Sequence, residues 1–401
     1  MISRKAILGG VLAATLALTG CAGGTGSNGE SSDETFLIYM NTPLTGALGN
    51  AAQLNVDTLN VAVDAVNADG GILGRQIEVV VADDQLDTTR AVTLLQEQID
   101  KRKPDLVFMG ATSNTALALL PLLSRNQIIS TASVQSAAIN DPAQYPYAFI
   151  PYITSLAEAP ALLTEMKANA YTKVALLTAN DANGQATAEA IIGEFESSGI
   201  EVAHESYTPT DIDMTSQLER LRDSNPDVLV IQAFGAATSH ILTSRTKLGW
   251  DIRTLGHSSM GLGQNMAEIS SPADWNNLYL GVFPITAGES PNPEVLADVL
   301  AAVKAEGNPM TQSLHYVGVY WDALQLFKKG FEQAGSTDAD AVKEALENLK
   351  PNPEIDAKLV TWPVEYQRWS ADNHFFPIPA DKLLTFVSPG PFVDGVITPE
   401  N

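Results

Sequence analysis

The chain has 401 residues, of which 45% are hydrophobic and 17% charged, a composition typical of a folded protein with a large core. Its length suits about two domains of ordinary size. The formal net charge of −24 argues against nucleic acid as a partner, because nucleic-acid binding relies on lysine and arginine side chains that neutralise phosphates.

The first residues have the pattern of an export signal. A basic pair at residues 4–5 precedes an apolar run over residues 6–18, which is too short to cross a bilayer as a helix of about 20 residues. The run ends in LTGC, which is similar to the bacterial lipobox and implies cleavage before Cys21 and lipidation of that residue. We predict a signal peptide over residues 1–20 and a flexible Gly/Ser-rich tether over residues 21–34.

The body begins with a strand pattern, FLIYM, and a helix pattern whose apolar residues recur every three or four positions. Gly70 and Gly71 follow the helix, and the apolar strand IEVVVADD then ends in Asp83 and Asp84. We expect the glycines to end the helix and turn the chain, and Asp84 to orient the loop after the strand. The continuous apolar run suggests a strand covered on both faces of its sheet.

Strands and helices continue to alternate. Further strands are expected at DLVFMG, IIST, KVALLTAN, EVAHES, DVLVIQAF and TLG, and further helices near residues 88–100, 115–125, 157–169, 185–198, 215–223 and 237–248. Such an order builds parallel sheets with helical crossovers, and it occurs here in two blocks of similar size. The predicted fold is therefore α/β, with two doubly wound Rossmann-like lobes and a ligand cleft between them.

The sequence offers no recognisable catalytic or metal-binding motif. The five histidines are scattered without metal-ligand spacing, and Asp211 and Asp213 lack the further oxygen ligands of a calcium loop. No G-x-S-x-G elbow follows a strand, and no phosphate-binding glycine motif is present. We therefore predict a protein that is not an enzyme and needs no cofactor or metal.

The segment MGATSNTALALL is the best candidate for ligand contact. A buried strand ends at Gly110, and a helix begins near Ser113 to Thr115. The first turn of such a helix has free backbone N–H groups and the positive end of the helix dipole, at the strand ends where open α/β sheets bind ligands. The residues alone leave two readings open: the segment binds a ligand, or Ser113 or Asn114 only caps its own helix.

Several segments together resemble a known family. NTPLTGALGN, LNVAVDAVNADGGILGRQIEVVVADDQLDTTRAV, PDLVFMGATSNTALALLPLL, KVALLTANDANGQ and PDVLVIQAFG are similar to the branched-chain amino-acid-binding family of type I periplasmic substrate-binding proteins. The resemblance covers about residues 36–349. It implies a hinged binding protein that captures a small solute outside the membrane and presents it to an ABC permease.

The resemblance also implies a ligand-binding set. Ser113 matches the serine that the family places on the ligand's carboxylate, and Ser258 lies near the position where amino-acid binders carry an acidic residue for the ammonium group. The complete predicted set comprises Ser113, Asn114, Ala132, Ser133, Asn183, Phe234, Ser258 and Tyr316.

These observations predict a monomeric, lipid-anchored, extracytoplasmic solute-binding protein. We expect an N-terminal lobe from residues 35–151 and 286–350, and a C-terminal lobe from residues 152–285 and 351–401. The solute is expected to be of amino-acid, amide or carboxylate type, because Ser113 and the helix start form a donor-rich site. Two alternatives are a ligand-sensing receptor module of the same fold and an exported α/β enzyme.

Overall fold

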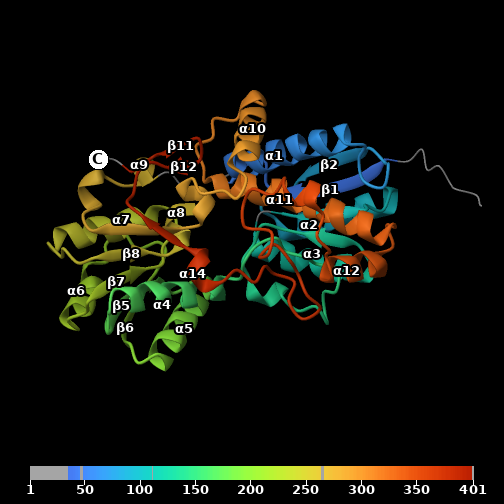
Figure 1. Ribbon diagram of the computed structural model, residues 1–401. Coiled ribbons are helices and arrows are strands. Elements are labelled where there is room, and N and C mark those ends of the chain that lie inside the picture. The colour runs from blue at the N-terminus through green and yellow to red at the C-terminus, as the bar shows by residue number, and fades with distance from the viewer. Residues whose placement is uncertain (1–34, 46–47, 111, 263–265, 400–401) are drawn as a thin grey trace, which may run out of the picture. The chain divides into compact units, whose positions relative to one another are not determined.

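The strands predicted from the sequence form two separate parallel sheets. The computed structural model describes residues 35–45, 48–110, 112–262 and 266–399. The predicted signal peptide, the tether and the lipidation site at Cys21 lie outside these residues. The described part from residue 35 onward belongs to one compact unit, coloured from blue to red in Figure 1.

The first sheet has four parallel strands in the order β2-β1-β3-β4. The strands are β1 (Phe36–Thr42), β2 (Ile77–Asp83), β3 (Leu106–Met109) and β4 (Ile129–Thr131). Every residue of β1 is buried, as expected of a central strand. The prediction that β2 is covered on both faces is confirmed in part. Consecutive residues from Val79 to Ala82, which alternate between the faces, all pack against the hydrophobic cluster of this sheet, but β2 is an edge strand and most of its residues are only half-buried.

The second sheet has six strands in the order β10-β9-β8-β7-β5-β6. Five of them run parallel, and the sixth, β10, pairs antiparallel with β9. The strands are β5 (Lys173–Ala179), β6 (Glu201–Tyr207), β7 (Val228–Ile231), β8 (Thr254–Gly256), β9 (Leu278–Val282) and β10 (Thr385–Val387). A small hairpin of β11 (Phe392–Val393) and β12 (Val396–Ile397) follows.

Helices connect the strands and cover both sheets (Figure 1). Around the first sheet they are α1 (Gly49–Ala68), α2 (Thr88–Lys101), α3 (Ser113–Arg125), α10 (Pro293–Ala305), α11 (Leu314–Ala334), α12 (Ala339–Glu347) and α13 (Pro353–Asp356). Around the second sheet they are α4 (Glu158–Ala168), α5 (Ala182–Ser197), α6 (Thr215–Asp223), α7 (Ala236–Lys247), α8 (Ser258–Leu262), α9 (Met266–Ile269) and α14 (Ala380–Leu383). Within the described residues, none of the helices has an apolar stretch long enough to cross a membrane.

The turn between α1 and β2 explains the glycine pair. The helix ends at Ala68, and Gly70 and Gly71 both adopt positive φ angles, of 94° and 80°. A Cβ on Gly71 would lie 1.9 Å from the backbone oxygen of Arg75, so no other residue fits there. The predicted helix stop and turn are confirmed.

Asp84 has the scaffolding role expected of it. Its Oδ1 accepts a hydrogen bond from the backbone N–H of Leu86 at 2.9 Å, and its Oδ2 accepts one from Asn41 Nδ2 at 3.0 Å. The carboxylate therefore ties the end of β1 to the loop after β2.

The C-terminal tail divides between the two lobes, contrary to the assignment of residues 351–401 to the second. Residues 359–378 contribute large apolar side chains to the hydrophobic cluster of the first sheet. Trp369 packs 5.5 Å from the ring of Phe149, and its Nε1 donates to the backbone oxygen of Ile150 at 3.0 Å. Only after this segment does the chain reach the second sheet at β10. Bulky aromatic side chains, rather than a helical or strand period, fix the tail's path.

Candidate functional site

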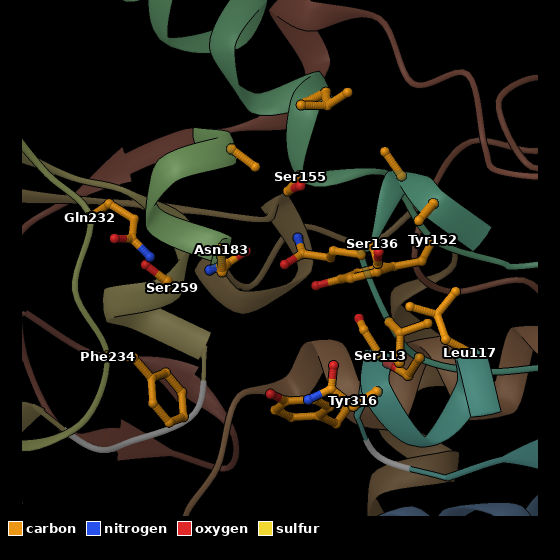
Figure 2. Close-up of a pocket in the computed structure, with 18 residues that line it drawn as sticks. Ser113, Leu117, Ser136, Tyr152, Ser155, Asn183, Gln232, Phe234, Ser259 and Tyr316 are labelled. Atoms are coloured by element: carbon orange, nitrogen blue, oxygen red, sulfur yellow. The ribbon is translucent and has the colours of Figure 1, made fainter. Parts of the chain in front are cut away.

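A cavity of about 580 Å³ lies where the strands of both sheets end, within the size range of small-molecule sites. Its wall is formed by eighteen residues, several of which are labelled in Figure 2. They are Ser113, Asn114, Leu117, Ser133, Val134, Gln135, Ser136, Ala137, Ala138, Tyr152, Ser155, Leu156, Asn183, Ala186, Gln232, Phe234, Ser259 and Tyr316. Among these described lining residues, no side chain carries a charge at neutral pH.

The first-lobe side of the cavity is built on the start of α3. The helix cap is Thr112, whose Oγ1 accepts a hydrogen bond from the backbone N–H of Thr115 at 3.2 Å. The alternative that Ser113 or Asn114 only caps the helix is therefore wrong. Both residues lie in the first helical turn and line the cavity, where the free N–H groups and the helix dipole favour an electron-rich ligand group.

The segment after β4 supplies the next part of the wall. Ser133 lines the cavity, whereas Ala132 is only 3% exposed and belongs to the first hydrophobic cluster. The prediction for Ala132 is displaced by one residue, because the lining segment begins at Ser133 and continues to Ala138. Gln135 also lines the cavity, and its Nε2 donates to Glu158 Oε1 at 3.3 Å.

The second-lobe side begins at α5 and at the end of β7. Asn183 lies in the first turn of α5, which is capped by Asp181 through a hydrogen bond from the Gly184 N–H at 2.8 Å. The buried Gln232 lines the cavity, and its Oε1 accepts from the Ala179 N–H at 3.0 Å. Since this bond fixes which end of the amide is oxygen, the Nε2 hydrogens of Gln232 remain as donors.

Ser258 lies behind the cavity wall. It is fully buried, and its hydroxyl donates to Glu158 Oε1 at 2.5 Å. The neighbouring Ser259 lines the cavity in its place. The predicted position is again displaced by one residue, here because α8 begins at Ser258 and turns successive side chains in different directions.

Aromatic residues form the remaining wall. Tyr152 and Tyr316 line the cavity, and burial raises the pKa of both phenols, so both stay protonated. Behind them, the His315 ring lies 4.6 Å from the rings of both Tyr152 and Phe283. Burial lowers the pKa of His315 to about 3 and keeps it neutral. Phe234, in contrast, is 55% exposed at the cavity.

The structure thus brings six of the eight predicted residues to one cavity: Ser113, Asn114, Ser133, Asn183, Phe234 and Tyr316. The sequence reasoning missed Gln135, Tyr152, Gln232 and Ser259. Gln232 could have been identified from the sequence, since it is a polar residue near the end of the apolar strand pattern DVLVIQAF. Tyr152 and Gln135 lie in irregular segments, where no periodicity indicates which side chain faces a cavity.

Comparisons with known proteins agree with this architecture. A family model described as "Periplasmic binding protein" matches residues 38–374. The Leu/Ile/Val-binding protein BraC3 of Rhizobium johnstonii is 24% identical over 338 residues, which cover 80% of this chain and 86% of that protein.

Two solved structures illustrate the fold similarity. The branched-chain amino acid transporter substrate-binding protein LivJ of Streptococcus pneumoniae, in complex with isoleucine, has a TM-score of 0.69 and 20% identity, with coverage of 89% of this chain and all of that one. A solute-binding protein of an ABC transporter from Rhodopseudomonas palustris, in complex with 3,4-dihydroxybenzoic acid, has a TM-score of 0.62 and 20% identity, with coverage of 78% and 85%.

Proposed function

Because the chain belongs to the periplasmic binding protein family, we propose that it captures a small amino-acid-, amide- or carboxylate-type solute outside the cytoplasm and delivers it to an ABC permease. The relatives that bind leucine, isoleucine and valine support the amino-acid members of this range. The relative bound to dihydroxybenzoic acid supports the carboxylates, since it shows that the same fold accepts a solute without an ammonium group.

The observation that carries this proposal is the cavity, which is lined from the strand ends of both sheets by uncharged polar and aromatic side chains. Ser113 and the start of α3 provide donors on one side, and Gln232 provides an amide donor on the other. Donors of this kind suit a carboxylate or carbonyl oxygen, while the aromatic wall suits an apolar body.

We propose hinge closure as the binding mechanism. One lobe would comprise residues 35–151, 286–350 and the adjoining tail segment 359–378, and the other would comprise residues 152–285 and the end of the chain. Leu156 is 43% exposed and Phe234 is 55% exposed, and both line the cavity. Closure on a ligand would remove these apolar surfaces from water, which favours the closed state.

The lipobox-like sequence supports attachment of the protein to the outer face of the membrane through Cys21. Dual or triple acylation at this position would give stable anchoring, whereas a single acyl chain binds membranes only marginally. We propose that the anchored protein acts as a monomer.

A thermal-shift screen followed by calorimetric titration tests the proposed function. The screen would include branched-chain amino acids, small amides, aromatic and aliphatic carboxylates, and sugars as a contrasting class. We expect a single class among the first three to raise the melting temperature and to bind with one-to-one stoichiometry. Binding of sugars alone would refute the solute class, and chemical turnover of a bound solute would identify an enzyme.

A further inference from the structure

A buried acid–imidazole pair lies directly behind the second-lobe wall of the cavity. Glu158, the first residue of α4, is fully buried, and His257, which follows β8, is 3% exposed. The Oε2 of Glu158 lies 3.1 Å from His257 Nε2, although the two atoms form no hydrogen bond. Burying such a pair is costly unless its remaining hydrogen-bonding capacity is used.

The other contacts of Glu158 all come from donors. Its Oε1 accepts from Ser258 Oγ at 2.5 Å and from Gln135 Nε2 at 3.3 Å, and its Oε2 also accepts from the Ser258 N–H at 3.2 Å. With every neighbour presenting a hydrogen, the arrangement suits a charged carboxylate. Glu158 therefore holds Gln135 of the cavity wall and the start of α8 from behind.

The hydrogen bonds also fix the proton on His257. The backbone N–H of Ser259 points at His257 Nδ1 from 3.2 Å, and an N–H can only donate. Nδ1 is therefore unprotonated, and the ring proton lies on Nε2, facing Glu158. The Ser259 hydroxyl also lies 3.2 Å from Nδ1, so its hydrogen can share this acceptor with the N–H, which leaves the lone pairs of the hydroxyl oxygen free.

Ser259 lines the cavity, opposite Ser113 (Figure 2). We infer that Glu158 and His257 hold Ser259 as a hydrogen-bond acceptor, so that the solute presents an N–H donor to the second lobe, from either an ammonium or an amide group. Glu158 and His257 are positioning residues, since neither lines the cavity. This inference rests on the proposed function, and it adds that the end of the solute facing the second lobe carries a hydrogen-bond donor.

The same contacts are also compatible with a purely structural role for Glu158 and His257. His257 would then only cap α8, and Glu158 would only tie α8 to α4, so that replacing either would lower stability without changing the choice of ligand. The two roles are therefore distinguished by the ratio of the affinities for two solutes, of which only one carries an N–H donor at the end in question, measured in the same variant.

The test uses leucine with 4-methylpentanoate, which lacks the ammonium group, and propanamide with methyl acetate, which lacks the amide N–H. Calorimetry on the full chain would compare wild type with Glu158→Gln and Ser259→Ala. Glu165→Gln is the matched control, since Glu165 lies on the same helix but pairs with Arg253 at 3.1 Å and does not line the cavity. The tautomer of His257 would be followed by ¹⁵N NMR.

We expect the N–H member of at least one pair to bind more tightly to wild type, by roughly ten- to a hundred-fold for the ammonium pair or roughly two- to ten-fold for the amide pair. Ser259→Ala should abolish the preference and Glu158→Gln should reduce it, whereas Glu165→Gln should leave it unchanged. The pair that shows the preference identifies the source of the N–H group.

Tight binding with an unchanged preference in Ser259→Ala and Glu158→Gln would overturn this inference and leave the proposed function intact. A His257 proton found on Nδ1 in the wild type would also overturn it. Failure of all four solutes to bind a folded wild-type protein would count against both the inference and the proposed solute class.

Discussion

Replacing Ser113 with alanine separates ligand binding from helix stability at the start of α3. Ser113 follows the cap, and its hydroxyl makes no hydrogen bond to another residue in the described part of the chain. A hydrogen bond to a charged group contributes about 1.5–3 kcal/mol, so Ser113→Ala should weaken binding of a carboxylate by about ten- to a hundred-fold. The melting temperature of the ligand-free protein should barely change, because no bond within the protein is lost.

Thr112→Ala is the matched variant, since Thr112 makes the cap hydrogen bond and does not line the cavity. It should cost about 1 kcal/mol of unfolding free energy, the usual effect of losing a threonine cap. Calorimetric titration gives the affinities, and differential scanning calorimetry gives the stabilities. Unchanged affinity of Ser113→Ala together with a clear loss of stability would refute the assignment of binding to Ser113 and stability to Thr112.

Other parts of the structure give further predictions. Gly184→Ala should destabilise the second lobe and weaken binding beside Asn183, because the new Cβ would lie 2.1 Å from the backbone oxygen of Ala179. The control is Gly193→Ala on the same helix, whose Cβ would meet nothing within 4 Å and which should stabilise the protein by up to about 1 kcal/mol. Equal changes of melting temperature in the two variants would refute the clash at Gly184. Burial raises the pKa of Asp322 from 3.8 to about 6, so the folded state holds this proton more tightly than the unfolded state does. The tighter proton binding contributes about 3 kcal/mol to the free energy of unfolding below pH 3.8, and this contribution is lost as the pH rises through 6. Asp322→Asn should remove this pH dependence from unfolding free energies measured by urea titration. Cys21→Ala should release a folded protein from membranes, and an intact mass showing unmodified Cys21 with its signal peptide would contradict the anchor. Small-angle scattering should show a smaller radius of gyration with the correct solute, and a tight ligand that changes neither scattering nor hydrogen exchange would contradict hinge closure.

The regular part of the fold was accessible from the sequence because its signals are periodic. The helix at α6 was predicted with its observed bounds. The prediction for α2 differs by one residue at its C-terminal end, and those for α4 and α7 differ by one residue at each end. Buried strands such as β3 and β7 show as short apolar runs between helices. The edge position of β2 was missed, since an apolar run does not reveal how many neighbours a strand has.

The irregular parts needed tertiary information. Trp369 lies in a segment with no helical or strand period, and its burial depends on Phe149, far away in the sequence. At the cavity, the choice between Ser258 and Ser259 depends on how α8 is oriented by Glu158. A single-residue displacement of this kind separates a lining side chain from a buried one, and local sequence carries no signal for it.

The path of the tail sets the order in which the protein can be assembled. β10 is the last strand of the second sheet, and it pairs with β9 only after α10 to α14 have been synthesised. The first hydrophobic cluster also depends on late residues, including Trp362 and Phe375. Contacts between segments so distant in sequence slow folding. A chain synthesised from its N-terminus therefore leaves both cores incomplete until its last residues are available, so both lobes complete their folding late.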